Sequence, residues 1–355
     1  MSLAGQQGAP AGELSGHLQQ CASAVLMVRP ACFGYNPETA ATNRLQKEPV
    51  RADSAGAHGA ASPAGSADSL CAHSAATSQA QALIEFDGFV RALRSEGISV
   101  AVAEDNPNPP RPDAVFPNNW VSFHEDGTLV LYPMQAENRR RERRPEVIDA
   151  VVRQLGFKVS RTVDLTHHES QGRFLEGTGS LVLDHRNRVA YACLSPRTHP
   201  DVVREWGREL GYHTVQFEAN DRGGTPYYHT NVMMCVGSRM AVLGTCAMST
   251  DDRARVIEKL EVTGHEVVEI GYDDIEQFAG NLLELASWDE ALGDCRLLVM
   301  SDTARRGLRP ETYARLSAGT DCVLAVPIPT IERLGGGSVR CMMAEVFLPA
   351  QAAAK

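Results

Sequence analysis

The sequence lacks several features that would each point to a particular class of protein. No stretch approaches the ~18 consecutive apolar residues of a transmembrane helix, and the first 24 residues show no basic segment before an apolar core. Lysine and arginine number 34 against 44 aspartates and glutamates, so the formal net charge is −10. A surface this acidic disfavours nucleic acid and anionic membranes as partners. We therefore expect a cytoplasmic protein that acts on small molecules.

Motifs for metals and nucleotides are also missing. None of the nine cysteines forms a C-x-x-C pair, so neither a zinc ribbon nor a redox dithiol is indicated. The glycine run 335–337 has neither the Gly-Lys-Ser/Thr of a phosphate-binding loop nor the spacing of a dinucleotide fingerprint. His167 and His168 stand beside Glu169, but without the i, i+4 spacing of a zinc-binding helix. We therefore expect no metal and no cofactor.

The 355 residues allow one large domain or two to three small ones. Residues 1–24 are read as a disordered tail, and residues 25–349 as one catalytic domain. Nineteen of the 27 residues from 54 to 80 are alanine, glycine or serine. A segment with so little to bury is expected to be a flexible insertion within that domain.

A pattern of hairpin, helix and strand recurs along the domain. Hairpin candidates begin near residues 119, 178, 230, 281 and 340, a period typical of propeller-like repeats. The last strand candidate, 341–349, has no helix after it. The strand candidate 24–30, the helix candidate 81–97 and the strand candidate 98–104 can complete that unit. The sequence thus predicts an α/β fold of five ββαβ units. A doubly wound parallel sheet is the alternative, although hairpins before the helices count against it.

Residues that can carry chemistry stand at the start of each unit, and a closed ring would bring them together near its axis. They are Asn118, Asn119, Glu176, His229, Asn281 and Cys341. A thiol, an imidazole and a carboxylate form a nucleophile, a base and an orienting acid. The neighbouring Arg340 is expected to lower the thiol pKa of Cys341. Each residue also has a purely structural interpretation, as a small buried hydrophobe, a core histidine and a turn carboxylate.

Six short stretches occur in an order that resembles the pentein superfamily, whose enzymes modify guanidino groups. They are residues 112–120, 139–142, 174–184, 194–198, 229–234 and 335–345. The nearest resemblance is to dimethylarginine dimethylaminohydrolases, arginine deiminases and citrulline hydrolases. Residues 28–43 look most like the citrulline-utilising hydrolases, which are often described as amidinotransferase-like.

The resemblance implies a five-bladed ββαβ propeller with pseudo-fivefold symmetry and a cofactor-free cysteine hydrolase. It implies that Cys341 is the nucleophile, that His229 carries protons and that Glu176 binds the reacting group. Arg197, together with Arg139 or Arg140, would hold the α-carboxylate of an amino-acid substrate, a task suited to the planar guanidinium.

Three positions depart from the deiminase pattern, because Asn119, Asn231 and Gly179 stand where relatives have acidic residues. Amides cannot neutralise a guanidinium, but they can hydrogen-bond a urea. We therefore expect Asn118, Asn119 and Asn231 to bind a ureido group, with citrulline hydrolysed to ornithine, carbon dioxide and ammonia.

Other activities stay open at this point. Within the resemblance, the alternatives are hydrolysis of arginine or methylarginine to citrulline and amidino transfer. A non-catalytic pentein similar to a ribosome-binding translation initiation factor belongs to a different class, as does a two-domain α/β binding protein. A homodimer is compatible with the sequence.

Overall fold

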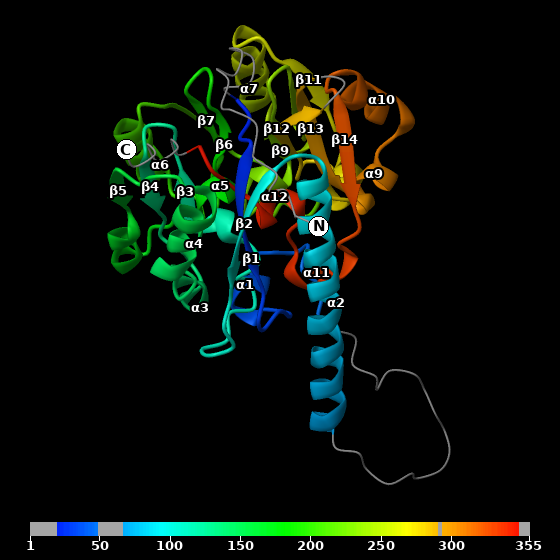
Figure 1. Cartoon of the computed structure of the whole chain (residues 1–355). Helices are drawn as coiled ribbons and strands as arrows, with labels where there is room; N and C mark the ends of the chain where they lie inside the picture. The colour runs from blue at the N-terminus through cyan, green and yellow to red at the C-terminus, as the bar shows by residue number, and fades with distance from the viewer. Residues whose placement is uncertain (1–19, 49–66, 290–292, 348–355) are drawn as a thin grey trace, which may run out of the picture.

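The computed structural model describes residues 20–48, 67–289 and 293–347. Its strands form five three-stranded sheets, each with the same internal order (Figure 1). In every sheet the first and second strands pair antiparallel, and the second and third pair parallel. This order confirms the five predicted ββαβ units, and it rules out a single doubly wound sheet.

We number these sheets as blades 1 to 5. Blade 1 holds β3 (Val121–Phe123), β4 (Thr128–Leu131) and β5 (Arg161–Asp164), and blade 2 holds β6 (Val182–Asp184), β7 (Val189–Cys193) and β8 (His213–Phe217). Blade 3 holds β9 (Met234–Val236), β10 (Met240–Leu243) and β11 (Glu266–Glu269), and blade 4 holds β12 (Leu283–Asp289), β13 (Gly293–Ser301) and β14 (Cys322–Val326). Blade 5 holds β15 (Ala344–Glu345), β1 (Ala24–Arg29) and β2 (Ser99–Glu104). First strands of several neighbouring blades touch, β15 with β3, β6 with β9 and β9 with β12, so these strands lie innermost.

Blade 5 is assembled from both ends of the described chain, as the repeat pattern predicts. β15 pairs antiparallel with β1, with Leu26 opposite Ala344. β1 then pairs parallel with β2 along its whole length. The connection from β1 to β2 runs through α1 (Pro37–Ala40) and the long α2 (Ala67–Ser95).

The helices between second and third strands carry clear start and stop signals. They are α4 (Pro145–Leu155), α6 (Pro200–Leu210), α7 (Thr250–Val262) and α10 (Pro310–Ala318). α4 and α6 begin with proline, which has no N–H to leave unpaired, and end at Gly156 and Gly211 in the left-handed conformation. Each turns an apolar stripe toward its sheet, and the largest side chain so buried is Trp206.

The structure differs from the prediction in the Ala/Ser-rich segment. Residues 67–80 form the first turns of α2, while residues 54–66 lie outside the described residues. Alanine has the highest helix propensity, so a segment with little to bury can still continue a helix. Gln79 fixes this part of α2, because its side chain accepts a hydrogen bond from the Phe33 N–H and donates one to the Pro30 carbonyl.

Residues 20–24 of the predicted tail belong to the described structure. Residues 1–19 lie outside the described residues, but Gln20 and Cys21 are buried. The Gln20 amide donates to the carbonyls of Leu183 in blade 2 and Val236 in blade 3. Residues 20–22 are therefore buried before β1 begins, and Gln20 connects two blades.

Four blades begin with a short helical turn instead of the strand expected there. These turns are η2 (Pro117–Asn119), α5 (Gly177–Ser180), η4 (Thr230–Val232) and α12 (Val339–Met342). η2 packs against α5 and α12, and α5 packs against η4. The turns therefore gather the residues that precede the innermost strands. Among the described helices, none is long and apolar enough to cross a bilayer.

Candidate active site

His229 and Glu176 form a buried pair. Glu176 lies directly before α5 and His229 directly before η4, so each ends the loop that enters its blade. The Nε2 atom of His229 lies 2.8 Å from the carboxylate oxygen Oε2 of Glu176, and both side chains are at most 2 % exposed. Glu176 also accepts a hydrogen bond from the Gln135 N–H. The backbone at the starts of blades 2 and 3 therefore sets the geometry of this pair.

Electrostatics fix the protonation of the pair. Burial alone would raise the pKa of Glu176, but the Arg197 cation and the His229 hydrogen bond outweigh it and lower the pKa to about 2. Burial lowers the pKa of His229 to about 4, against the pull of Glu176. Near neutral pH an ionised carboxylate thus accepts the Nε2 proton of a neutral imidazole, which leaves the Nδ1 lone pair as a base.

Cys341 lies in α12 and is buried between two amides. The Nδ2 atoms of Asn281 and Asn231 lie 3.3 and 3.5 Å from its Sγ atom. Asn281 also donates to the Asn231 carbonyl and accepts from the Arg340 N–H, so it ties the starts of three blades together. Burial raises the pKa of the Cys341 thiol although both amides act in the opposite direction.

Arg340 acts on the thiol in the direction that the sequence analysis expects, but it does not decide the thiol pKa. Its guanidinium pairs at 2.8 Å with Glu345, whose side chain is 9 % exposed, and donates to the Met343 carbonyl. Arg340 still lowers the pKa of Cys341, but burial outweighs it. Although Arg340 is next to Cys341 in the sequence, its guanidinium is thus paired mainly with a carboxylate in β15.

Cys341 and His229 line one narrow cavity. Its lining residues are Thr39, Asn43, Asp113, Phe116, Asn119, Arg139, Arg197, Tyr228, His229, Gly335, Gly336, Gly337 and Cys341. The Asn43 amide donates to the carbonyls of Gly335 and Gly336, and the Tyr228 hydroxyl donates to Gly336 as well. The segment after α1 and the glycine run therefore close the cavity together.

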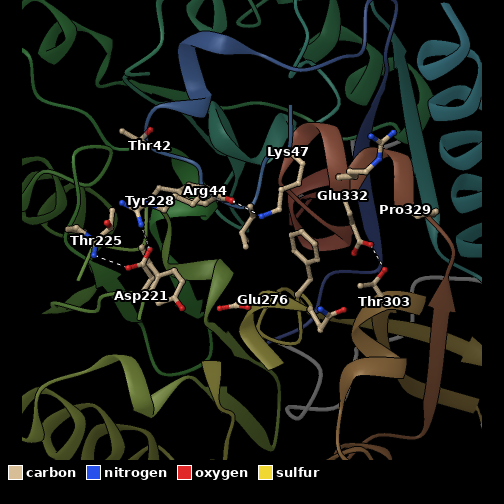
Figure 2. A pocket seen from close by; sticks show the side chains of 16 residues that line it. Thr42, Arg44, Lys47, Asp221, Thr225, Tyr228, Glu276, Thr303, Pro329 and Glu332 are labelled. Carbon is tan, nitrogen blue, oxygen red and sulfur yellow. Dashed lines mark hydrogen bonds and ion pairs between the residues drawn. The ribbon is translucent and has the colours of Figure 1, made fainter. Parts of the chain in front are cut away.

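A larger cavity of 540 Å³ adjoins it and shares Tyr228 in its wall (Figure 2). Charged groups of both signs line it, among them Arg44, Lys47, Asp221 and Glu332. It contains neither Cys341 nor His229. The thiol of Cys341 and the imidazole of His229 thus line the smaller cavity, and the larger cavity lies next to it.

The three predicted arginines occupy different places. Arg197 lines the cavity, lies 3.5 Å from Glu176 and donates to Thr42 and to the Thr39 carbonyl. Arg139 also reaches the cavity wall, but two of its nitrogens bind the buried Glu142 at 2.9 Å. Arg140 is outside the cavity wall, where it donates to the Met134 and Gln135 carbonyls. Of these three, Arg197 is best placed to meet a substrate.

The predicted asparagines are all buried, in different settings. Asn119 accepts from Arg139 through Oδ1, while its Nδ2 has no partner among the described residues. Both polar atoms of the Asn118 side chain likewise lack a partner in the described part of the chain, and this residue is not in the cavity wall. Asn231 contacts the thiol. Asn119 and Asn231 are therefore the two of this set that face the cavity or its sulfur.

Gly179 explains one departure from the relatives' pattern. A Cβ atom at this position would lie 2.7 Å from Nδ1 of His229 and would also collide with Nδ2 of Asn119. An acidic side chain cannot occupy this position unless both residues move. The absence of an acidic residue at this position therefore leaves room for the imidazole of His229, in addition to removing a negative charge.

The sequence analysis gave no role to Asp113, which lines the cavity. Its Oδ2 accepts from Asn36 and Thr39 and lies 3.8 Å from Arg139. Its buried Oδ1 has no partner among the residues described. The resemblance includes this position within residues 112–120, but only the fold brings Asp113 to the cavity. Asn281 was noted at a unit start, and its contact with the thiol was not foreseen.

Comparisons with known proteins agree with the fold. ArgZ, an arginine dihydrolase from the ornithine–ammonia cycle in cyanobacteria, matches in its apo structure with a TM-score of 0.66 and 16% identity, over 92% of this chain and 41% of ArgZ. Its N-terminal domain bound to substrate matches at 0.64 and 16%, over 92% of this chain and 99% of the domain. A dimethylarginine dimethylaminohydrolase adduct with 4-chloro-2-hydroxymethylpyridine matches at 0.55 and 15%, over 91% and 99%. The chain thus spans about two fifths of full-length ArgZ.

These structures confirm the predicted pentein fold. No curated protein sequence gives a significant match. A sequence model of the family described as N,N dimethylarginine dimethylhydrolase, eukaryotic, matches residues 51–348. Because this match extends over most of the chain, the protein belongs to the N,N dimethylarginine dimethylhydrolase family.

Proposed function

We propose that the protein hydrolyses the guanidino group of a methylated arginine, which yields citrulline and a methylamine. The observation that carries this proposal is the cavity lined by both Cys341 and His229, whose imidazole is paired with Glu176, in a chain of this family. The family match favours this activity over the hydrolysis of citrulline that the sequence analysis preferred.

The first step is attack on the guanidino carbon. Burial keeps Cys341 largely as a thiol, and a bound guanidinium offsets that effect because a nearby cation favours the thiolate. The Cys341 sulfur forms a bond to the carbon, and the bond from carbon to the methylated nitrogen breaks. The amine leaves with a proton from His229, which acquired that proton from the thiol.

The second step returns the enzyme to its resting state. His229 takes a proton from a water molecule, whose oxygen bonds to the carbon of the S-linked intermediate. The C–S bond then breaks and the proton on His229 returns to the sulfur. The product's ureido group gives its remaining extra proton to solvent, and citrulline leaves. Glu176 stabilises the imidazolium in both steps through the hydrogen bond at Nε2, which keeps Nδ1 directed toward the Gly179 side of the site.

The amino-acid end of the substrate can be held by opposite charges in the same wall. A guanidinium has five N–H donors, and Arg197 uses four of them in the structure, so one remains for an α-carboxylate. The unpartnered Oδ1 of Asp113 suits the α-ammonium group. Arg139 instead serves as a positioning residue, since its bidentate pairing with Glu142 holds it against Oδ1 of Asn119.

Hydrolysis of citrulline to ornithine is the second candidate. The observation in its favour is that the side-chain amides of Asn231 and Asn281 contact the sulfur. Unlike a carboxylate, an amide cannot neutralise a bound guanidinium. An amide can donate to the oxygen of a urea, which a carboxylate cannot do.

Product analysis separates the two candidates. The purified protein is incubated separately with dimethylarginine, monomethylarginine, arginine and citrulline, and the amine and amino-acid products are identified. Citrulline with dimethylamine or methylamine supports the proposal, provided that Cys341→Ala is inactive. Ornithine from citrulline supports the second candidate, and turnover of none of the four substrates would overturn both.

A further inference from the structure

The His-His motif that the proposed function does not use lies in a cluster on the outer surface. His167 and His168 belong to η3 (Thr166–Gln171), which follows β5, and Glu205 lies on α6 of blade 2. One ligand atom from each of the three residues lies within 4.8 Å of the others. Glu169, the acidic neighbour in sequence, is occupied elsewhere, because both of its oxygens bind Arg143. In the folded protein, the carboxylate beside His168 is therefore that of Glu205, 37 residues away in the sequence, and not that of Glu169.

We propose that His167, His168 and Glu205 bind a divalent zinc-type cation. Two imidazole nitrogens and one carboxylate oxygen form the ligand set that Zn²⁺ accepts, with a further position left for water. The Nε2 atoms of His168 and His167 lie 2.9 and 3.9 Å from the two oxygens of Glu205, and the ring centroids are 4.1 Å apart. Small side-chain rotations bring all three atoms to one ion.

Two further observations point to a ligand at this place. The Nδ1 atom of His167 faces the Asp164 carbonyl at 3.3 Å, an outer contact that holds the proton on Nδ1 and directs the Nε2 lone pair outward. Glu205 lies within 4.0 Å of these two imidazoles, and it forms no ion pair with a lysine or arginine in the described part of the chain.

The position of the cluster gives the ion a structural role. η3 belongs to the connection that leads from β5 in blade 1 to Glu176, while α6 connects β7 and β8 in blade 2. An ion held by both elements fastens the approach to Glu176 onto the next blade. Because the ion binds only the folded protein, it raises the melting temperature as its concentration exceeds the dissociation constant.

The test uses Zn²⁺ itself and the Cys341→Ala variant, which removes the thiol of the proposed active site as a competing ligand. Calorimetric titration is expected to show one saturable site, with a matching rise in melting temperature. His168→Ala and Glu205→Gln in that background are expected to lose at least the roughly 10–100-fold of affinity that even an outer contact contributes. His213→Ala, at the exposed start of β8, is the matched control and should bind as before.

Equal zinc binding in Glu205→Gln, His168→Ala and the control would overturn the proposal, as would the lack of any saturable site. Glu205→Gln keeps the shape of the side chain and so tests the site even if His168→Ala fails to fold. With Cys341 intact, the same Glu205→Gln variant should retain hydrolytic activity. The outcome is therefore independent of the proposed function.

Discussion

Single residues decide the chemistry at this site, and the sulfur of Cys341 is the first to test. Cys341→Ala should fold normally and lose at least about 10⁴-fold in kcat, since the nucleophile acts as a unit with His229. Cys193→Ala is the matched control, because Cys193 is equally buried in β7, where burial raises its thiol pKa to about 12. Steady-state kinetics of both variants check this, and near-normal turnover by Cys341→Ala contradicts the covalent mechanism.

Gly179 offers a second test at the scale of one methyl group. Its backbone is helical, so Gly179→Ala should fold, but the added carbon would stand 2.7 Å from Nδ1 of His229. Displacing the imidazole by about 1 Å should lower kcat about 10²-fold. Gly271→Ala, where the nearest atom is 3.6 Å away, is the control. If both variants turn over substrate equally well, Nδ1 is not the reacting nitrogen.

The sequence predicted which residues lie at the site better than it predicted which residues pair with one another. Cys341, His229, Arg197 and Asn231 were named from motifs, and the fold places them at or beside one cavity. The expected effect of Arg340 was inferred from its place next to Cys341 in the sequence. In the fold, its side chain instead pairs with Glu345. The choice of partner for a long charged side chain depends on three-dimensional neighbours that no linear spacing reveals.

At the scale of elements, α2 supports the helix that leads to the nucleophile. The Glu85 carboxylate accepts hydrogen bonds from the Thr330 and Ile331 N–H groups, at the start of α11 (Pro329–Gly335). These N–H groups have no partner within the helix, so Glu85 caps it from outside. Figure 1 shows α2 running beside α11, the helix that ends at Gly335.

Glu85→Ala should therefore lower the free energy of unfolding by about 1–3 kcal/mol, the cost of buried donors left unpaired. It should also lower kcat/KM, because α11 positions Gly335–Gly337 against the cavity. Denaturant unfolding and kinetics measure both effects, with Glu96→Ala near the end of α2 as the control. Unchanged stability would mean that solvent replaces the cap.

The order of elements could be predicted, because hairpin, helix and strand differ in hydrophobic period and the pattern repeats. Two features could not. The Ala/Ser-rich residues 67–80 are helical because alanine favours a helix and because Gln79 fixes this part of α2, and the second cause is a tertiary contact that local composition does not reveal. The helical turns at the blade starts are too short to produce a period, so they were assigned to strands.

For the molecule as a whole, buried neutral histidines predict sensitivity to acid. Burial lowers the pKa of His124 and of His229 to about 4 from the ordinary 6.5. Both are neutral when folded but protonated when unfolded below that ordinary value, so their contribution to stability is complete above it and falls as the pH drops toward 4. Between about pH 7.5 and about pH 5, each should cost about 2 kcal/mol of unfolding free energy.

Denaturant unfolding at these two pH values tests the effect on the wild type and on His124→Gln. His124 lies outside the proposed active site and is hydrogen-bonded to Ser122. Its replacement should reduce the loss of stability by about 2 kcal/mol, because glutamine cannot take up the proton. An identical pH dependence in the two proteins would show that His124 titrates normally.

The ring closure in blade 5 has a consequence for biosynthesis. β1 and β2 precede blades 1 to 4 in the chain, whereas α12, with Cys341, and β15 follow them. A ribosome therefore synthesises the residues of four blades and of two strands of the fifth before it adds the proposed nucleophile. Intermediates stalled earlier, and chains shortened by proteolysis before α12, lack the sulfur and the strand that seals the ring. Turnover in a cell extract thus counts finished molecules, and incompletely translated ones stay chemically silent.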